Sequence, residues 1–428
     1  MLKILTHRDF RICILLFFVG ALRKYDVTII ARLPVGELLA FASIPFLIHG
    51  GLIQRYKRPV MYFVGLFLIW SLGIVLSDLL NEFVFLRFIR GLMKPLFSCL
   101  WMLFFIGVLS RRRAPQAFMF YIVGGLFAAV QNWLMPTSFE AEYMATGGYE
   151  ALAFGIGPAI ASLNSVIANL LYGYHPLLAA VSYFMSAVVK VVMGSPRSGI
   201  AMQLLVVSFI CYLWWRVRIL KRPIRLSLGR LIPASMLLGV LCLAIYYTYV
   251  FIAGQGWMGE LQHAKLLAQQ QTIFGTNPLG LLLDGRTAVF GAILAIIDNP
   301  LLGYGSWTAW MMTDYYYEAV SLVGTNSGKL RMIMNADYAG IGHSVLFQGW
   351  VENGILAATA LLVVGWTSLK QFIRLMESNV PYAPYFIALF ISFCWSYFFS
   401  PFGTGTRFMI GLICAINATD FFGKREWR

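Results

Sequence analysis

The chain has 428 residues, of which 60% are hydrophobic and only 12% are charged. A water-soluble domain carries about 25% charged residues, so this composition excludes a soluble globular protein. The mean hydropathy of +0.75 and the aromatic share of 16% are typical of a membrane protein with aromatic side chains at the lipid interface. The formal net charge of +15 therefore predicts basic cytoplasmic loops and an anionic ligand, and no nucleic-acid partner.

Twelve apolar segments approach the length of about 20 residues that a membrane-spanning helix needs. They cover residues 10–22, 36–53, 60–77, 88–110, 117–135, 151–171, 175–193, 199–215, 231–253, 351–369, 384–400 and 406–422. We therefore predict an all-α integral membrane protein with about 12 transmembrane helices. The six cysteines lie in apolar runs without a CxxC pair, and are predicted to be core residues rather than disulfides or metal ligands. Since no signal-peptide pattern precedes the first segment, we expect it to be retained as an anchor.

The basic residues set the predicted orientation. Clusters at 55–58, 111–113 and 216–230 fall on the same side of the membrane as both termini. The positive-inside rule makes that side cytoplasmic.

One long segment without a predicted span, 254–350, falls on the outer side of the membrane. It separates the first nine predicted spans, in 1–253, from the last three, in 351–428. A connection of this length in a compact protein is usually functional, so we predict that this single large outer loop is the catalytic region.

Two short helices are predicted within this loop. Residues 259–273 have an amphipathic pattern. A second helix is predicted to start at Asp284-Gly285-Arg286-Thr287 and to run to Asp298, because proline at position 300 cannot continue it.

Three basic residues share one face of the fourth predicted span, at its outer end. Arg87, Arg90 and Lys94 are spaced three and four residues apart, which places them on one helical stripe. Three cations so arranged repel one another unless an anion lies between them, so we predict a site for a lipid diphosphate head group. Snorkelling to interfacial phosphates is an equally open interpretation.

Two further arginines are candidates for phosphate binding. Arg197, in the segment 194–199, comes just before a predicted helix whose N-terminal amides would add to an anion pocket. Binding to lipid head groups is the alternative. Arg286 offers a planar guanidinium fork suited to phosphate oxygens, with an ion pair to Asp284 or Asp298 as the alternative.

His343 is the candidate base, because imidazole near pH 7 can accept a proton from a sugar hydroxyl; taken alone, it is more often a structural interfacial residue. Glu352 is expected to support the site by holding an arginine or a helix start. Arg407, at the mouth of the last span, is expected either to add to a basic cavity or to anchor its helix. Three carboxylates in predicted outer loops are weaker candidates for an acidic base: Asp26, Asp78 and Glu82.

Taken in chain order, four segments resemble the O-antigen ligase and polymerase superfamily of bacterial envelope glycosyltransferases. They are Ser195-Pro196-Arg197-Ser198-Gly199, Gly285-Arg286 at the head of a helix, Asn299-Pro300-Leu301-Leu302-Gly303-Tyr304-Gly305, and His343-Ser344 through Glu352-Asn353-Gly354. The resemblance is specific over about 195–356. Elsewhere it is limited to span count and polarity.

This resemblance implies a C-type glycosyltransferase-like fold in the bacterial inner membrane, with a periplasmic active site. It implies transfer of a glycan from undecaprenyl diphosphate to an acceptor hydroxyl, without a nucleotide sugar, a metal or another cofactor. It maps diphosphate binding onto Arg197 and Arg286, and base or acceptor positioning onto His343. Pro196 departs from the family pattern, in which a small residue directly precedes the arginine, so Arg197 is carried over less firmly than His343.

The partners expected from this resemblance are an undecaprenyl-diphosphate-linked oligosaccharide, an acceptor glycan or lipid A-core, and membrane lipids. A chain-length regulator and a flippase stay open as further partners. A polymerase of lipid-linked repeat units is favoured over a ligase that attaches finished chains to lipid A-core or protein. A polysaccharide-lipid transporter or flippase would also have twelve spans, but it should contain pseudo-symmetric halves with matching broken helices, and no internal repeat is present. A non-catalytic assembly subunit is the remaining interpretation.

Overall fold

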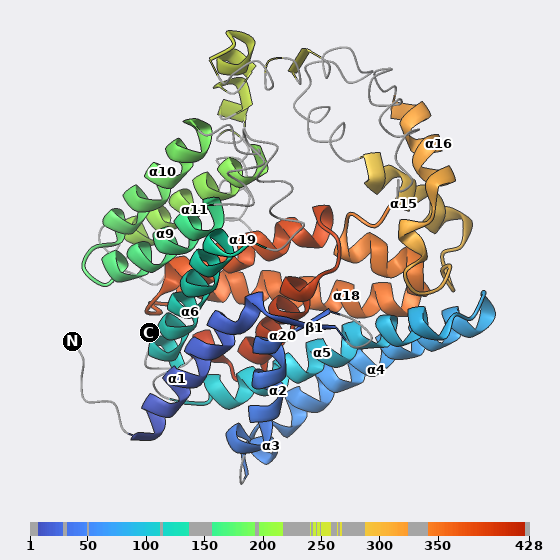
Figure 1. The fold of residues 1–428 in the computed structure, drawn as a ribbon, viewed down its shortest axis with the longest axis horizontal. Helices are drawn as coiled ribbons and strands as arrows, with labels where there is room; N and C mark the ends of the chain where they lie inside the picture. Colours follow the sequence, from blue (N-terminus) through green and yellow to red (C-terminus); the bar gives the residue numbers. More distant parts are fainter. Residues whose placement is uncertain are drawn as a thin grey trace.

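A computed structural model describes residues 7–28, 32–48, 51–111, 114–136, 156–192, 197–216, 250–257, 287–323 and 341–423, with a few further positions between 240 and 267. Helices make up nearly all of the ordered elements in this part of the chain (Figure 1). The predicted all-α class is confirmed for these residues. The exception is one short antiparallel hairpin, β1 (Asp26–Thr28) and β2 (Arg32–Pro34).

The α-helices are α1 (His7–Ala21), α2 (Val35–Leu47), α3 (Leu52–Arg55), α4 (Lys57–Leu80), α5 (Phe85–Leu109), α6 (Ala114–Leu134), α9 (Gly157–Tyr172), α10 (Pro176–Val192), α11 (Arg197–Trp215), α15 (Thr287–Asp298), α16 (Thr313–Val323), α18 (Val345–Glu377), α19 (Ala383–Phe399) and α20 (Thr404–Ala418). Short 3-10 turns follow or join them: η1 (Leu22–Lys24), η3 (Thr308–Trp310) and η4 (Phe421–Gly423).

Each predicted span overlaps at least one observed helix, apart from 231–253, most of which lies outside the described residues, and two of them, 36–53 and 351–369, are interrupted. Within the described residues, four helices are long and apolar enough to cross a membrane: α4, α5, α6 and α18. Shorter apolar helices accompany them, including α2, α10, α11, α15 and α19. The chain is therefore a membrane protein, whereas the twelve-span topology with both termini inside stays a prediction.

The first two predicted spans needed correction at their shared edge. The hairpin between them pairs Asp26 with Pro34 and Thr28 with Arg32, and nothing in the apolar pattern predicted it. The predicted segment 36–53 is not one helix, because α2 ends at Leu47 and a separate turn, α3, begins after Gly51.

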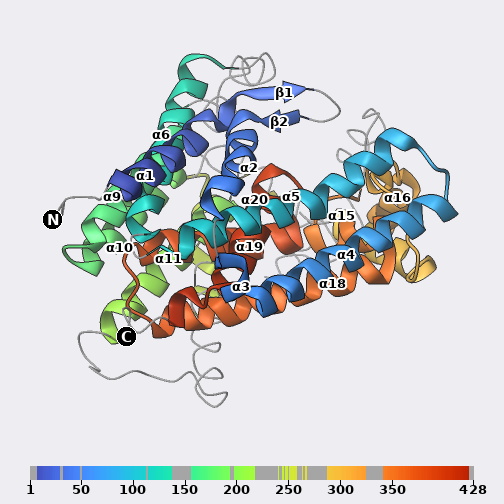
Figure 2. The ribbon, with the colours of Figure 1, turned by 90° about the horizontal axis from the view of Figure 1, so that it is seen from below.

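The helices form a central bundle with smaller groups at its two ends. Helices α4, α5, α18, α19 and α20 make up the bundle, α1, α6, α9, α10 and α11 pack together at one end, and α15 with α16 lies at the other (Figures 1 and 2). Small residues allow close approach: a Cβ on Gly411 of α20 would lie 2.8 Å from the backbone nitrogen of Met102 in α5.

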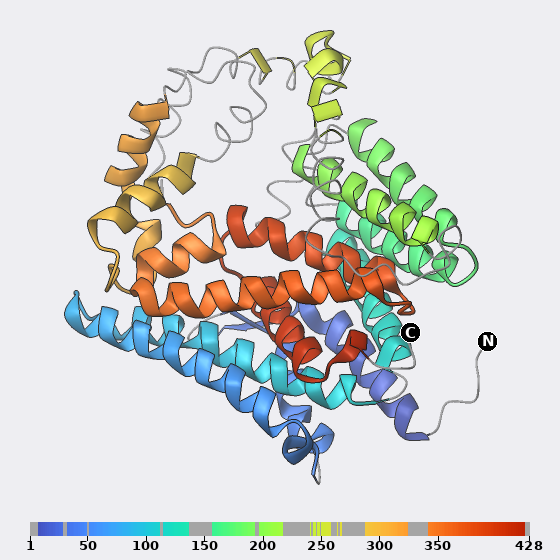
Figure 3. The same ribbon diagram turned by 180° about the vertical axis from the view of Figure 1, so that it is seen from behind.

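Helix α18 reverses direction inside the predicted span 351–369, which is the main correction to the fold. Gly354 has φ 67° and ψ −163°, a conformation that is not helical. Gly349, before this break, packs directly on Leu361, after it, and two residues in a continuous helix twelve positions apart would be about 18 Å apart. Residues 345–353 therefore form a short helix that folds back along the longer part of α18 (Figure 3).

The break predicts that Gly354→Ala prevents correct folding. The observed dihedral angles belong to a region that is accessible essentially only to glycine, and a Cβ would overlap the carbonyl oxygen of Leu301. We expect this variant to lose the monodisperse peak in size-exclusion chromatography in detergent. Gly65→Ala is the matched control, since no heavy atom lies within 4 Å of its Cβ position in α4. A monodisperse Gly354→Ala protein with the melting temperature of the control would contradict the described reversal.

Candidate functional site

A buried ion pair lies where α18 reverses. The ammonium of Lys94, on α5, binds Glu352 Oε2, and the exposed fractions of the two residues are 4% and 0%. Charged groups inside a membrane protein are costly, and usually mark a functional region. The sequence predicted Lys94 as a diphosphate ligand and Glu352 as a supporting residue, and the structure places the two side chains in direct contact.

The pair is enclosed by polar and aromatic groups. Gln348 donates to Glu352 Oε1 at 2.9 Å, and its own Oε1 accepts from the backbone nitrogen of Phe402 at 3.0 Å. The ammonium of Lys94 lies 5.0 Å from the ring centroid of Trp307 and 5.6 Å from that of Phe402, within reach for cation–π attraction. The charge of Lys94 is thus already balanced inside the protein, which makes Lys94 a structural organiser of the site.

The segment 301–306, which follows α15, closes over the break in α18. The backbone nitrogens of Tyr304 and Gly305 donate to the carbonyl oxygens of Val351 and Glu352, both at 2.9 Å. The nitrogen of Ile355 donates to Leu301 O at 3.0 Å. Backbone groups freed by a broken helix need partners in a membrane protein, and here the segment 301–306 supplies them. This segment belongs to the motif that carries the family resemblance.

The same segment is tied to α4. Ser77 Oγ donates to Glu352 O at 2.7 Å and accepts from the nitrogen of Gly305 at 2.9 Å. Asp78 accepts from the nitrogen and from the hydroxyl of Ser306, both at 2.7 Å. The Ser306 hydroxyl lies against Gly91 of α5, so closely that a Cβ there would overlap it. The segment is therefore fixed to α4, α5 and α18 at once.

Arg87 and Arg90 lie in the first two turns of α5, on the N-terminal side of Gly91. Both are half-buried. The predicted basic stripe therefore borders the place where the 301–306 segment docks, with Lys94 at its buried end.

His343 lies at the start of the re-entrant helix, with an exposed side chain. Its ring meets the ring of Trp310 edge to face at a centroid distance of 5.4 Å. The next residue, Ser344, is the N-cap of α18: its Oγ accepts from the nitrogen of Phe347 at 3.2 Å and donates to Tyr397 O at 2.9 Å. The histidine is thus held just before a capped helix start, and its side chain remains exposed.

Neither of the other two predicted arginines, Arg286 and Arg197, is fully described by the structure. Arg286 lies outside the described residues. Arg197 is the first residue of α11, and only its backbone is described. Helix α15 begins at Thr287, directly after Arg286, and ends at Asp298 as predicted. Each arginine is therefore at, or next to, a helix N-terminus, where backbone N–H groups favour an anion.

Arg407 belongs to a second buried pair. Its Nε donates to Glu37 Oε1 at 2.8 Å and its Nη2 bonds to Glu37 Oε2. The indole of Trp101 also donates to Glu37 Oε1 at 2.8 Å, and the guanidinium lies 4.8 Å from the ring centroid of Phe97. Of the two expected roles, the contacts fit anchoring of α20 to α2 and α5. Glu37 was overlooked, although a lone carboxylate in an apolar segment is itself a signal.

A chain of hydrogen-bonded phenols joins α15 and α16. The hydroxyls of Tyr304 and Tyr315 are 2.8 Å apart, and Tyr315 donates to Asp298 at 2.6 Å. Desolvation and these hydrogen bonds raise the pKa of Tyr315, so its phenol stays protonated and serves as a donor. Asp298, one of the two ion-pair partners considered for Arg286, therefore already accepts a hydrogen bond from Tyr315.

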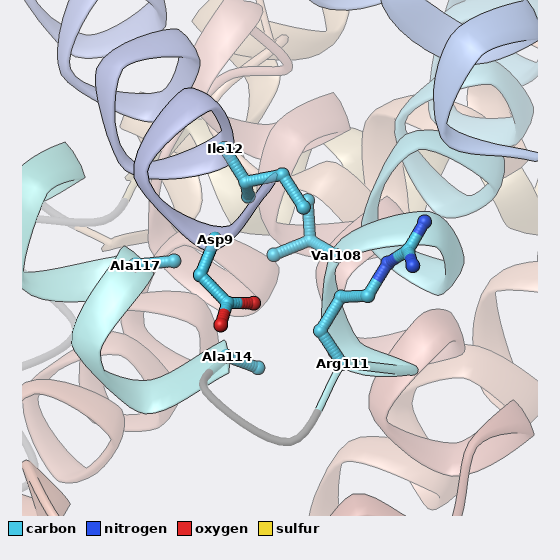
Figure 4. A pocket seen from close by; sticks show the side chains of 6 residues that line it. All are labelled: Asp9, Ile12, Val108, Arg111, Ala114 and Ala117. Atoms are coloured by element: carbon cyan, nitrogen blue, oxygen red, sulfur yellow. The ribbon is translucent and has the colours of Figure 1, made fainter. Parts of the chain in front are cut away.

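A small cavity lies between α1, α5 and α6, and none of the candidate site residues lines it (Figure 4). Its volume is about 10 Å³ and it is lined by Asp9, Ile12, Val108, Arg111, Ala114 and Ala117. This is room for about one water molecule, so the cavity does not fit a sugar or a diphosphate.

The buried pair predicts strong coupling between Lys94 and Glu352. Lys94→Met or Glu352→Gln alone leaves a charge buried without its partner, which costs about 3–5 kcal/mol. The double variant has neither charge, so we expect its loss of stability to be well below the sum of the single losses. The melting temperatures of the wild type, the two single variants and the double variant in detergent give the four corners of this double-mutant cycle.

Arg374 and Asp420 provide the matched control cycle. They form an ion pair at 2.6 Å whose side chains are 38% and 62% exposed, and such pairs contribute about 0–1 kcal/mol. If the Lys94 and Glu352 losses simply add, as expected for this exposed pair, the buried contact is not a coupled pair.

Compared with models of known protein families and with curated proteins, the chain matches none. The resemblance therefore depends on the four sequence segments alone, and two of them, 299–305 and 343–354, pack together in the structure.

Proposed function

We propose that this membrane protein is a glycosyltransferase that uses a lipid diphosphate donor. In this proposal a glycan passes from undecaprenyl diphosphate to an acceptor sugar hydroxyl at the outer face of the inner membrane, with inversion at the anomeric carbon. A polymerase of lipid-linked repeat units is the favoured form, and a ligase is the alternative within the same reaction class.

One observation supports the proposal above the others. The segment 301–306 docks at Gly91, between the two arginines and Lys94 of the Arg87–Lys94 stripe, and on the re-entrant helix that follows His343 and carries Glu352. A cationic surface and a candidate base are thereby gathered at one end of the bundle. These are the two groups that transfer from a diphosphate requires.

The chemistry follows from the bond that breaks. Cleavage of the anomeric C–O bond leaves new negative charge on the diphosphate, and fixed guanidinium groups at a low-dielectric boundary stabilise it. Arg197, Arg286, Arg87 and Arg90 are the groups proposed for this role. His343 is proposed to remove the proton of the acceptor hydroxyl as that oxygen attacks the face opposite the diphosphate.

The broken helix bears on the alternative of a transporter. In transporters, backbone freed by a helix break coordinates the substrate or a coupling ion. In this protein, the carbonyls of Val351 and Glu352 and the nitrogen of Ile355 bond to the 301–305 segment. The break is thus used to attach the outer segment, which favours the enzyme over the transporter.

We expect Arg286→Ala and His343→Ala to abolish glycan transfer without loss of expression, because each removes a group that stabilises or forms the transition state. The measurement is transfer in vitro with purified undecaprenyl-diphosphate glycan, with and without a chelator, which should not change the rate. Arg374→Ala, at an exposed ion pair, is the control. Full activity of both variants would remove the proposed mechanism.

We expect Arg87→Gln and Arg90→Gln to raise the KM for the lipid donor by about tenfold each, the loss of about 1.4 kcal/mol of binding per charged contact. Added lipid diphosphate should also protect both arginines from phenylglyoxal. An unchanged KM together with unchanged labelling would contradict donor binding by Arg87 and Arg90, and would indicate that they contact lipid head groups instead.

The products separate the two forms of the enzyme. With a lipid-linked repeat unit as sole donor and acceptor, a polymerase yields a ladder of chain lengths on a gel. A ligase yields no ladder and requires lipid A-core or a protein acceptor.

A further inference from the structure

Asp78 is a buried carboxylate with an unusual set of partners. It lies in the last turn of α4 with an exposed fraction of 3%. Both of its oxygens accept from one residue, Ser306, at 2.7 Å from the backbone nitrogen and 2.7 Å from the hydroxyl. Ser306 itself is 1% exposed. Burial of a carboxylate costs free energy, because the charge loses its water. Strong hydrogen bonds from neutral donors offset part of this cost and fix the donors in place.

Ser306 leads directly into the turn that supports His343. The hydroxyl of Thr308 donates to Gly305 O at 2.5 Å, and η3 follows. The carbonyl of Ala309 then accepts from the nitrogen of Ile341 at 2.7 Å. Asp78 is therefore joined, through Ser306 and η3, to the residues that immediately precede His343.

Trp310 completes this connection. A Cβ on Gly342 would lie 2.7 Å from Trp310 Cε2, so the backbone before His343 rests on the indole. The imidazole of His343 meets the same indole at 5.4 Å. On its other side the histidine is fixed by the Ser344 N-cap, so the η3 contact is one of two anchors that set its position.

We propose that Asp78 is a positioning residue for His343, which it holds in place through Ser306 and the turn that carries Trp310. The inference deepens the proposed function and rests on it for the role of His343. Asp78 itself stays under Ser306 and does not reach the acceptor. This differs from the interpretation of Asp78 as an acidic base that the sequence left open.

The two interpretations differ in what they require of the side chain. Positioning needs one acceptor for the Ser306 nitrogen and a partner for the Ser306 hydroxyl, which can accept as well as donate. Asparagine supplies both, with its carbonyl oxygen and its amide. A base requires the carboxylate, so asparagine would be as harmful as alanine.

The position of His343 is measured directly by its rate of acylation with diethyl pyrocarbonate, quantified by peptide mass spectrometry. The chain contains five histidines, and the peptide readout isolates this one. The full-length protein in detergent is compared as wild type, Asp78→Ala, Asp78→Asn and Glu82→Ala. Glu82 is the control, an exposed carboxylate just beyond the same end of α4.

We expect severalfold faster acylation of His343 in Asp78→Ala, because the ring loses its fixed contact with Trp310, and wild-type rates in Asp78→Asn and Glu82→Ala. An unchanged rate in Asp78→Ala overturns the proposal, as does an equal acceleration in Asp78→Asn. Should Asp78→Ala not fold, Ser306→Ala tests the same link by removing the hydroxyl alone. It should accelerate labelling by a smaller factor, and an unchanged rate overturns the proposal.

Kinetics in the transfer assay add a second readout. A displaced base lowers kcat by about 10- to 100-fold, with an unchanged KM for the lipid donor, in Asp78→Ala but not in Asp78→Asn. Equal loss of kcat in both variants contradicts positioning and supports a base. If wild-type protein transfers no glycan while labelling responds as predicted, the link between Asp78 and His343 stands and the proposed function fails.

Discussion

The buried pair of Lys94 and Glu352 is the contact on which the rest of the site depends. An isolated charge in a membrane protein is too costly to keep, so each partner requires the other to be in place. Glu352 lies two residues before the break at Gly354, and Lys94 lies on α5, 258 positions away in the sequence. Their contact holds the reversal of α18 against α5, and the segment 301–306 docks on the surface that these helices form with α4.

The segment 301–306 connects the broken helix α18 to α4 and to the turn beside His343, and so brings the residues of the candidate site together. It satisfies the backbone of the broken helix, binds Ser77 and Asp78 on α4, and leads into the turn beneath His343. A histidine on an exposed loop would sample many positions, whereas one supported from both sides is held close to a single geometry. Such preorganisation matters for transfer, because misplacement of a catalytic group by about 1 Å can cost about 100-fold in rate.

Local sequence patterns predicted most of the helices. They could not predict contacts between residues that are far apart in the chain. Hydropathy located the main helices, and Pro300 predicted the end of α15 at Asp298, since both signals depend on neighbouring residues. The reversal at Gly354 stayed hidden, because an apolar run on either side of one glycine is also consistent with a continuous helix. Arg407 and Glu37 are separated by 370 positions, so the sequence left a basic cavity and a helix anchor open as roles for Arg407 and did not identify its partner. The same reason made Lys94 a predicted ligand of phosphate.

We propose that a lipid diphosphate binds between the N-terminal end of α5 and the helix that begins after His343. Photo-crosslinking with a diazirine analogue of undecaprenyl diphosphate tests it most directly, with adducts mapped by mass spectrometry. The account predicts adducts in residues 85–94 and 341–352, which excess unlabelled lipid diphosphate suppresses. Adducts confined to other helices, with none in these two segments, would contradict it.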